Sequence, residues 1–85
     1  MGYHELIIPY PDDLLLSLKV TPEYFEAEAR LLLAIKLYEL GRVTTGTAAK
    51  IAGMDRVTFI FNLERFGLSP IGDTPDELEA DLANA

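Results

Sequence analysis

Residues 21–41 read TPEYFEAEARLLLAIKLYELG, and they predict one long helix. Thr21 is a good N-cap, Pro22 suits the first helical position, and Gly41 can end the helix in a left-handed turn. Between these signals the apolar residues recur at helical spacing. We therefore predict a central helix over residues 22–40.

Apolar side chains cover more of this helix than one core contact uses. They form three stripes: Phe25, Leu32 and Ile35; Tyr24, Leu31 and Tyr38; and Leu33, Leu37 and Leu40. A small monomer has no second layer to cover the remainder, although its own short helices could wrap part of it. We therefore expect a homodimer or higher homo-oligomer, whose interface includes Leu6, Ile8, Leu31, Leu32, Ile35 and Tyr38.

Composition predicts a single domain over residues 1–85 and argues against an enzyme. No apolar run approaches the ~20 residues of a membrane span, and the N-terminus lacks the pattern of a signal peptide. There is no cysteine, and His4 is the only histidine, which leaves few groups for catalysis. We expect a cytoplasmic protein that has no membrane contact, no cofactor, no metal site and no catalytic residue.

Charge is distributed unevenly along the chain. Residues 1–40 carry three bases and seven acids, a net charge of −4, whereas residues 41–72 carry four bases and two acids, a net charge of +2. Residues 73–85 carry five acids and no base. Nucleic-acid binding would therefore depend on the middle segment, and the acidic end favours a basic partner.

The first 21 residues predict a short strand and a short helix. Residues 3–8 are strand formers that stop at Pro9 and Pro11, and pairing with a second copy of the chain would give such a strand a partner. Asp12 or Asp13 can cap the helix that follows. This layout resembles ribbon-helix-helix proteins, but the strand lacks their groove-reading side chains, so we expect it to hold a dimer together.

Residues 44–67 predict a helix-turn-helix. Thr44 or Thr45 can cap a first helix that ends at Ala52, Gly53 supplies the turn, and Asp55 caps a second helix over residues 56–66. Helical spacing places Phe59, Leu63 and Phe66 toward the core and Val57, Phe61 and Glu64 on the outer face.

Two interpretations of the outer surface remain open. Val57 and Phe61 form an apolar pair that suits burial against another protein. DNA contact would instead use the polar residues Lys50, Arg56, Thr58, Asn62 and Arg65.

Residues 73–85 predict an acidic C-terminal helix. Thr74 and Pro75 are start signals, and Leu78 and Leu82 make one narrow apolar stripe. The helix could be solvated and held to its own domain by these leucines. Alternatively, Leu78, Glu79 and Leu82 bind a partner and mask a basic cleft.

The chain resembles the uncharacterised protein family numbered 0175, which consists of small prokaryotic proteins regarded as antitoxin-like. The resemblance is carried mainly by Leu-Tyr-Glu-Leu-Gly-Arg at residues 37–42 and by Ala-Gly-Met at residues 52–54. It implies a helix-turn-helix antitoxin that is paired with a ribonuclease toxin of the PIN-domain type and that also represses its own operon through operator DNA.

The expected fold is therefore mainly helical, with an N-terminal strand, a long central helix, a helix-turn-helix and an acidic C-terminal helix. The expected function is that of an antitoxin that neutralises a ribonuclease. Two alternatives are a helix-turn-helix transcriptional regulator and a self-assembling module that binds no nucleic acid.

Overall fold

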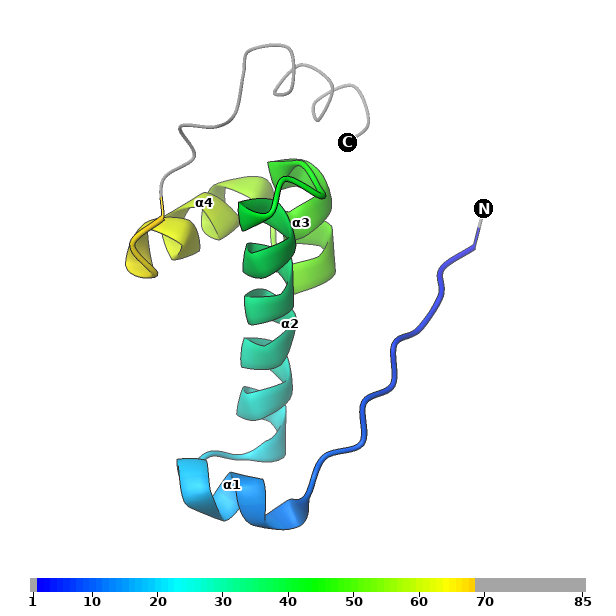
Figure 1. Ribbon diagram of the computed structural model, residues 1–85, viewed down its shortest axis with the longest axis vertical. Coiled ribbons are helices and arrows are strands. Elements are labelled where there is room, and N and C mark those ends of the chain that lie inside the picture. The colour runs from blue at the N-terminus through cyan, green and yellow to red at the C-terminus, as the bar shows by residue number, and fades with distance from the viewer. Residues whose placement is uncertain (1, 69–85) are drawn as a thin grey trace.

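The computed structural model describes residues 2–68, which form four helices (Figure 1). These are α1 (Asp12–Leu18), α2 (Pro22–Glu39), α3 (Thr45–Ala52) and α4 (Arg56–Arg65). Figure 1 shows α2 as a long column, with α1 at one end and α3 and α4 at the other. Over residues 2–68 the prediction of a mainly helical protein is confirmed.

Local signals set both ends of α2. The hydroxyl of Thr21 accepts a hydrogen bond from the backbone N–H of Tyr24 at 3.2 Å, and Pro22 occupies the first helical position. After the last turn the backbone adopts a left-handed conformation at Gly41, where φ is 73°. The helix is one residue shorter than the predicted range.

The helices α3 and α4 are joined by a tight turn. Thr44 caps α3 by accepting a hydrogen bond from the Thr47 N–H at 3.3 Å, and Asp55 caps α4 by accepting one from the Thr58 N–H at 2.8 Å. Gly53 ends α3 with φ at 76°, a conformation that costs residues with a Cβ about 1–2 kcal/mol. This turn brings α4 back across α3.

The core lies where the second half of α2 meets α3 and α4. The small side chains in α3 let its backbone approach α2 closely, and Phe59 and Leu63 of α4 fill the remaining space. The ring of Phe59 packs edge-on against Tyr38, with the ring centroids 6.1 Å apart. The buried apolar residues are Leu31, Ala34, Ile35, Ala48, Ala49, Ala52, Phe59 and Leu63.

The N-terminal part of the described chain makes no such core. No residue between 2 and 29 is buried, and this range includes the whole of α1. The best-defined contact there joins Tyr10 to the start of α2: its ring lies 4.8 Å from that of Phe25, and its hydroxyl donates a hydrogen bond to Glu26 at 2.6 Å.

Three sequence predictions need correction. The strand over residues 3–8 is absent from the described part of the chain, because a strand exists through hydrogen bonds to a neighbouring strand and residues 2–68 supply none. Neither Asp12 nor Asp13 is the N-cap of α1: that position is Pro11, and both carboxylates lie in the first turn, where the helix dipole favours them. Phe66 ends α4 as a partly exposed C-cap and is not in the core, because the helix stops one residue early.

Candidate protein-binding surface

The helix α4 presents two opposite apolar faces. Phe59 and Leu63 are completely buried in the core, whereas Val57 and Phe61 have 60% and 65% of their surface exposed. Val57 and Phe61 are four residues apart, so their side chains lie next to each other on the outer face. We call this pair the α4 patch. A pair of exposed apolar side chains of this size on one helix suits contact with another protein.

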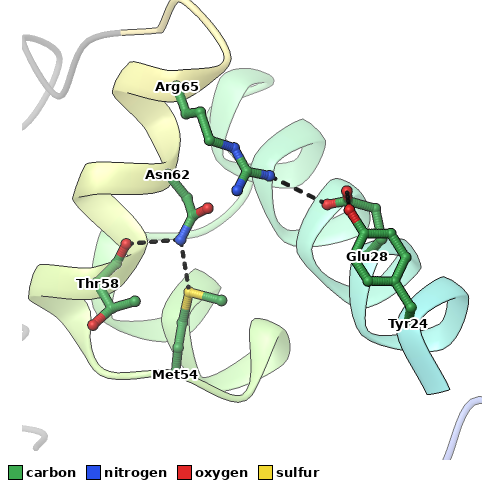
Figure 2. Close-up of polar contacts among 6 residues, drawn as sticks. All are labelled: Tyr24, Glu28, Met54, Thr58, Asn62 and Arg65. Carbon is green, nitrogen blue, oxygen red and sulfur yellow. Dashed lines mark hydrogen bonds and ion pairs between the residues drawn. The ribbon is translucent and has the colours of Figure 1, made fainter.

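Asn62, one of the predicted DNA-contacting residues, points back into the fold. Its side-chain amide donates a hydrogen bond to the backbone carbonyl of Thr58 at 3.0 Å and lies 3.5 Å from the sulfur of Met54 (Figure 2). A base contact by this amide would require the Asn62 side chain to give up both interactions.

Arg65 is also engaged within the chain. Its guanidinium lies 3.5 Å from one carboxylate oxygen of Glu28, and the other carboxylate oxygen accepts a hydrogen bond from the Tyr24 hydroxyl at 3.3 Å (Figure 2). The same guanidinium lies 5.1 Å from the centroid of the Phe66 ring. Exposed ion pairs contribute about 0–1 kcal/mol, so this contact orients Arg65 more than it stabilises the fold.

Arg56 holds the turn between α3 and α4. Its Nε donates a hydrogen bond at 3.0 Å to the hydroxyl of Thr45, which is completely buried at the start of α3. This bond satisfies a polar group that would be costly to bury alone. Lys50 lies exposed on α3. Of the five residues predicted to contact DNA, Arg56, Asn62 and Arg65 therefore use their polar atoms inside the fold.

The Asp55 cap is the most clearly defined electrostatic feature of this surface. The carboxylate accepts the hydrogen bond of the Thr58 N–H, which favours its charged form and lowers the pKa of Asp55 below its ordinary value of 3.8. The charge also lies at the N-terminus of α4, where a helix dipole favours an anion. The Asp55 carboxylate is therefore charged at neutral pH, where it caps the start of the helix that carries Val57.

Arg30 is a structural residue that the sequence analysis missed. Its Nε donates a hydrogen bond at 3.0 Å to the backbone carbonyl of Ile51, in the last turn of α3, where a cation is favoured. A Cβ at Gly53 would lie 3.1 Å from both terminal nitrogens of this guanidinium. No local sequence signal identifies Arg30, because its partner is 21 residues away.

The residues predicted for an oligomer interface divide into two groups. Leu31 and Ile35 are buried in the core of their own chain, and Tyr38 is half-buried against Phe59. Leu6, Ile8 and Leu32 are exposed.

The second predicted partner-binding segment is the acidic C-terminal segment. Leu78, Glu79 and Leu82 lie outside the described residues. Within residues 2–68, no cluster of three or more His, Asp or Glu side chains could hold a metal ion. No helix in the same range is both long and apolar enough to cross a membrane.

The fold and the α4 patch define a small helical protein with an exposed apolar pair on its last described helix. The sequence model that describes the uncharacterised protein family UPF0175 matches residues 1–85, so the chain belongs to this family. It is 35% identical over 82 residues to a UPF0175 protein of Aeropyrum pernix, a match that covers 96% of this chain and 86% of that relative.

A second relative supports the same assignment. The chain is 40% identical over 57 residues to a UPF0175 protein of Archaeoglobus fulgidus, covering 67% of this chain and 64% of that relative. No solved structure matches the chain.

Proposed function

We propose that this protein is the antitoxin of a type II toxin–antitoxin pair, which binds and neutralises a ribonuclease of the PIN-domain type without catalysing a reaction. The observation that carries the protein-binding part is the α4 patch, in which Val57 and Phe61 are exposed on a helix whose other face is fully buried. The resemblance described above supplies the class of partner.

The two faces of α4 have different roles in this proposal: one binds the partner and the other holds the helix in the core. Burying an exposed Phe or Val side chain contributes about 1.5–3 kcal/mol, so the α4 patch can act as the centre of an interface. Phe59 and Leu63 hold the same helix in the core and fix the position of the patch. The proposed second contact is the acidic C-terminal segment with Leu78, Glu79 and Leu82, whose carboxylates would compete with RNA phosphates for a basic cleft.

The test begins with affinity purification of the tagged protein from its source cells after nuclease treatment, followed by mass spectrometry. A recovered ribonuclease is then produced alone, and its cleavage of RNA is titrated with the antitoxin. We expect inhibition to be complete near equal amounts of the two proteins.

The variant Val57→Asp/Phe61→Asp tests the α4 patch in this assay. We expect it to weaken inhibition by at least 100-fold, because it places two charges in an apolar contact. The matched control is Glu64→Ala, a polar residue on the same outer face, which should inhibit like the natural protein. Recovery of no ribonuclease contradicts the antitoxin role, and unchanged inhibition by the Asp variant contradicts the role of the patch.

The second candidate is a DNA-binding regulator, which would include repression of the protein's own operon. It is favoured by the pair α3 and α4 joined by a tight turn, in a segment whose net charge is +2. Lys50 and Thr58, which are both exposed, would be among its contacts. A DNA affinity that falls steeply with salt, and that Lys50→Ala weakens, would support this function over the first.

A further inference from the structure

Residues 2–29 contain a group of large apolar side chains that nothing in the described chain covers. We call residues 2–10 the N-terminal arm. Soluble proteins expose scattered apolar residues, but they seldom gather so many in one segment unless it is an interaction surface. The exposed members are Tyr3, Leu6, Ile7 and Ile8 of the arm, Leu16 and Leu18 of α1, and Tyr24 of α2.

The helix α2 carries a second uncovered apolar surface. Leu33 and Leu40 are exposed and Leu37 is half-buried, and their spacing of four and three residues is that of a coiled-coil seam. At about 100° per residue, Leu33 lies about 160° around the helix from both Leu31 and Ile35 of the core. We call Leu33, Leu37 and Leu40 the back stripe of α2.

The arm is about as long as the helix that carries the back stripe. An extended segment of nine residues spans about 30 Å, and a helix of the 18 residues of α2 spans about 27 Å. Pro9 and Pro11 favour an extended backbone at the base of the arm. One arm can therefore lie along the whole of one α2 helix.

The base of the arm is fixed, whereas the arm itself is exposed. The ring of Tyr10 packs at a tilt against that of Phe25, and its hydroxyl donates a hydrogen bond to Glu26; both partners lie near the start of α2. Beyond Tyr10, residues 2–9 are all exposed, and Figure 1 shows the arm leading away from the helices. The arm thus leaves the back stripe of its own chain open.

We propose that a second copy of this chain covers these surfaces, so that the arm and α1 of each copy lie on the back stripe of the other copy. The exchange is reciprocal, as two-fold symmetry requires, and it covers both kinds of surface without a further protein. The eight exposed large apolar side chains of the arm, α1 and the back stripe offer roughly 100 Å² each, or about 800 Å² per copy, and a standard stable interface buries about 800 Å² per partner.

The first test uses cross-linking, which the absence of cysteine makes unambiguous. Full-length Ile8→Cys and Leu40→Cys chains of different tag length are mixed, refolded together and treated with a short bis-maleimide. We expect a cross-linked product that contains one chain of each kind. The matched control pairs Ile8→Cys with Glu64→Cys, an exposed position on α4, and should give no such product.

The doubly substituted chain Ile8→Cys/Leu40→Cys separates exchange from closure within one chain. A cross-link that forms within a single chain at high dilution, with none between mixed chains, overturns the proposal because the arm then covers its own α2. Cross-links from Ile8→Cys to Glu64→Cys as strong as those to Leu40→Cys overturn it as well.

The second test measures the dimer directly by sedimentation equilibrium. We expect the natural protein to be a dimer at micromolar concentration and Leu33→Asp/Leu40→Asp to raise the dissociation constant by at least 100-fold. Val57→Asp/Phe61→Asp is the matched control on α4 and should leave it unchanged. A monomer at all concentrations overturns the proposal, as does a dimer that only the α4 substitutions dissociate. Whether the protein dimerises in this way does not depend on the antitoxin role, because the dimer uses the arm, α1 and the back stripe of α2, whereas the antitoxin role uses the α4 patch.

Discussion

Residues 2–29 and residues 30–68 contain a similar share of apolar residues, about half of each segment, but only the second segment has a core. In residues 30–68 three helix segments cross and exclude water from Phe59 and Leu63. In residues 2–29 the helix α1 and the N-terminal arm present similar side chains to solvent. Apolar composition therefore does not make a core by itself, because burial requires elements that close on one another.

The comparison also explains why the two segments suit different tasks. The buried side chains Phe59 and Leu63 hold α4 in the core and so fix the position of its outer face, as a binding surface requires. A segment without a core gains most of its stability from whatever covers it, as an exchanged arm does. Three pairs of variants and one single variant test the stability of residues 30–68, and one of the pairs compares it directly with that of residues 2–29.

The largest effect is expected for Phe59→Ala. Removing a completely buried Phe should lower the free energy of unfolding by about 3–5 kcal/mol, because it leaves a cavity in the core. The matched control is Phe61→Ala, in the same helix but exposed, which should change stability by less than about 0.5 kcal/mol. Urea denaturation followed by circular dichroism measures both, and equal losses would contradict the assignment of the two faces.

The next effect is expected for Gly53→Ala. Alanine at φ of 76° should cost about 1–2 kcal/mol, and its Cβ also presses on the Arg30 guanidinium that holds α3 to α2. Gly67→Ala has the same φ, and no atom of residues 2–68 lies within 4 Å of the added Cβ, so it should show the backbone strain alone. Thermal melts compare the two, and a Gly67→Ala loss as large as that of Gly53→Ala would mean that Arg30 simply moves aside.

A smaller effect separates the two segments through their helix caps. Thr44→Ala should cost about 1 kcal/mol, because Thr44 caps a helix that is packed in the core. Thr21→Ala should cost the free chain less, because the first turn of α2 lies outside the core and can fray locally. Native-state hydrogen exchange at both helix starts checks this order. Equal losses of stability for Thr44→Ala and Thr21→Ala would contradict the difference between the two segments.

The smallest effect is a dependence on pH at Asp55. Its lowered pKa means that the folded state favours the carboxylate, so this contribution is present at pH above the ordinary value of 3.8 and is lost as the pH falls through the lowered pKa. Asp55→Asn keeps a capping oxygen but does not titrate. We expect the difference in melting temperature between the natural protein and this variant to shrink from pH 7 to pH 3. A difference that stays constant over this range would exclude the charge as its cause.

Much of the fold could be predicted from local sequence. The cap residues Thr21, Thr44 and Asp55 and the left-handed turn at Gly53 mark helix boundaries through contacts within four residues. The spacing of Phe59 and Leu63 correctly identified the buried face of α4.

The candidate site was less predictable, because its polar residues depend on distant partners. Arg56 resembles a phosphate contact in sequence, but it binds Thr45, which is 11 residues away. Arg65 resembles one as well, but it pairs with Glu28 on another helix. The N-terminal strand could not be judged from residues 3–8 alone, because strand formation depends on a partner.

For residues 2–68 the sequence by itself therefore determined a mainly helical fold, the positions of the helices and the exposed apolar pair on α4, because caps, turns and helical spacing act over a few residues. Only the tertiary structure decided which polar side chains hold the fold together and that residues 2–29 have no core. These properties depend on which helices meet, and contacts between residues far apart in sequence form only when the chain has folded.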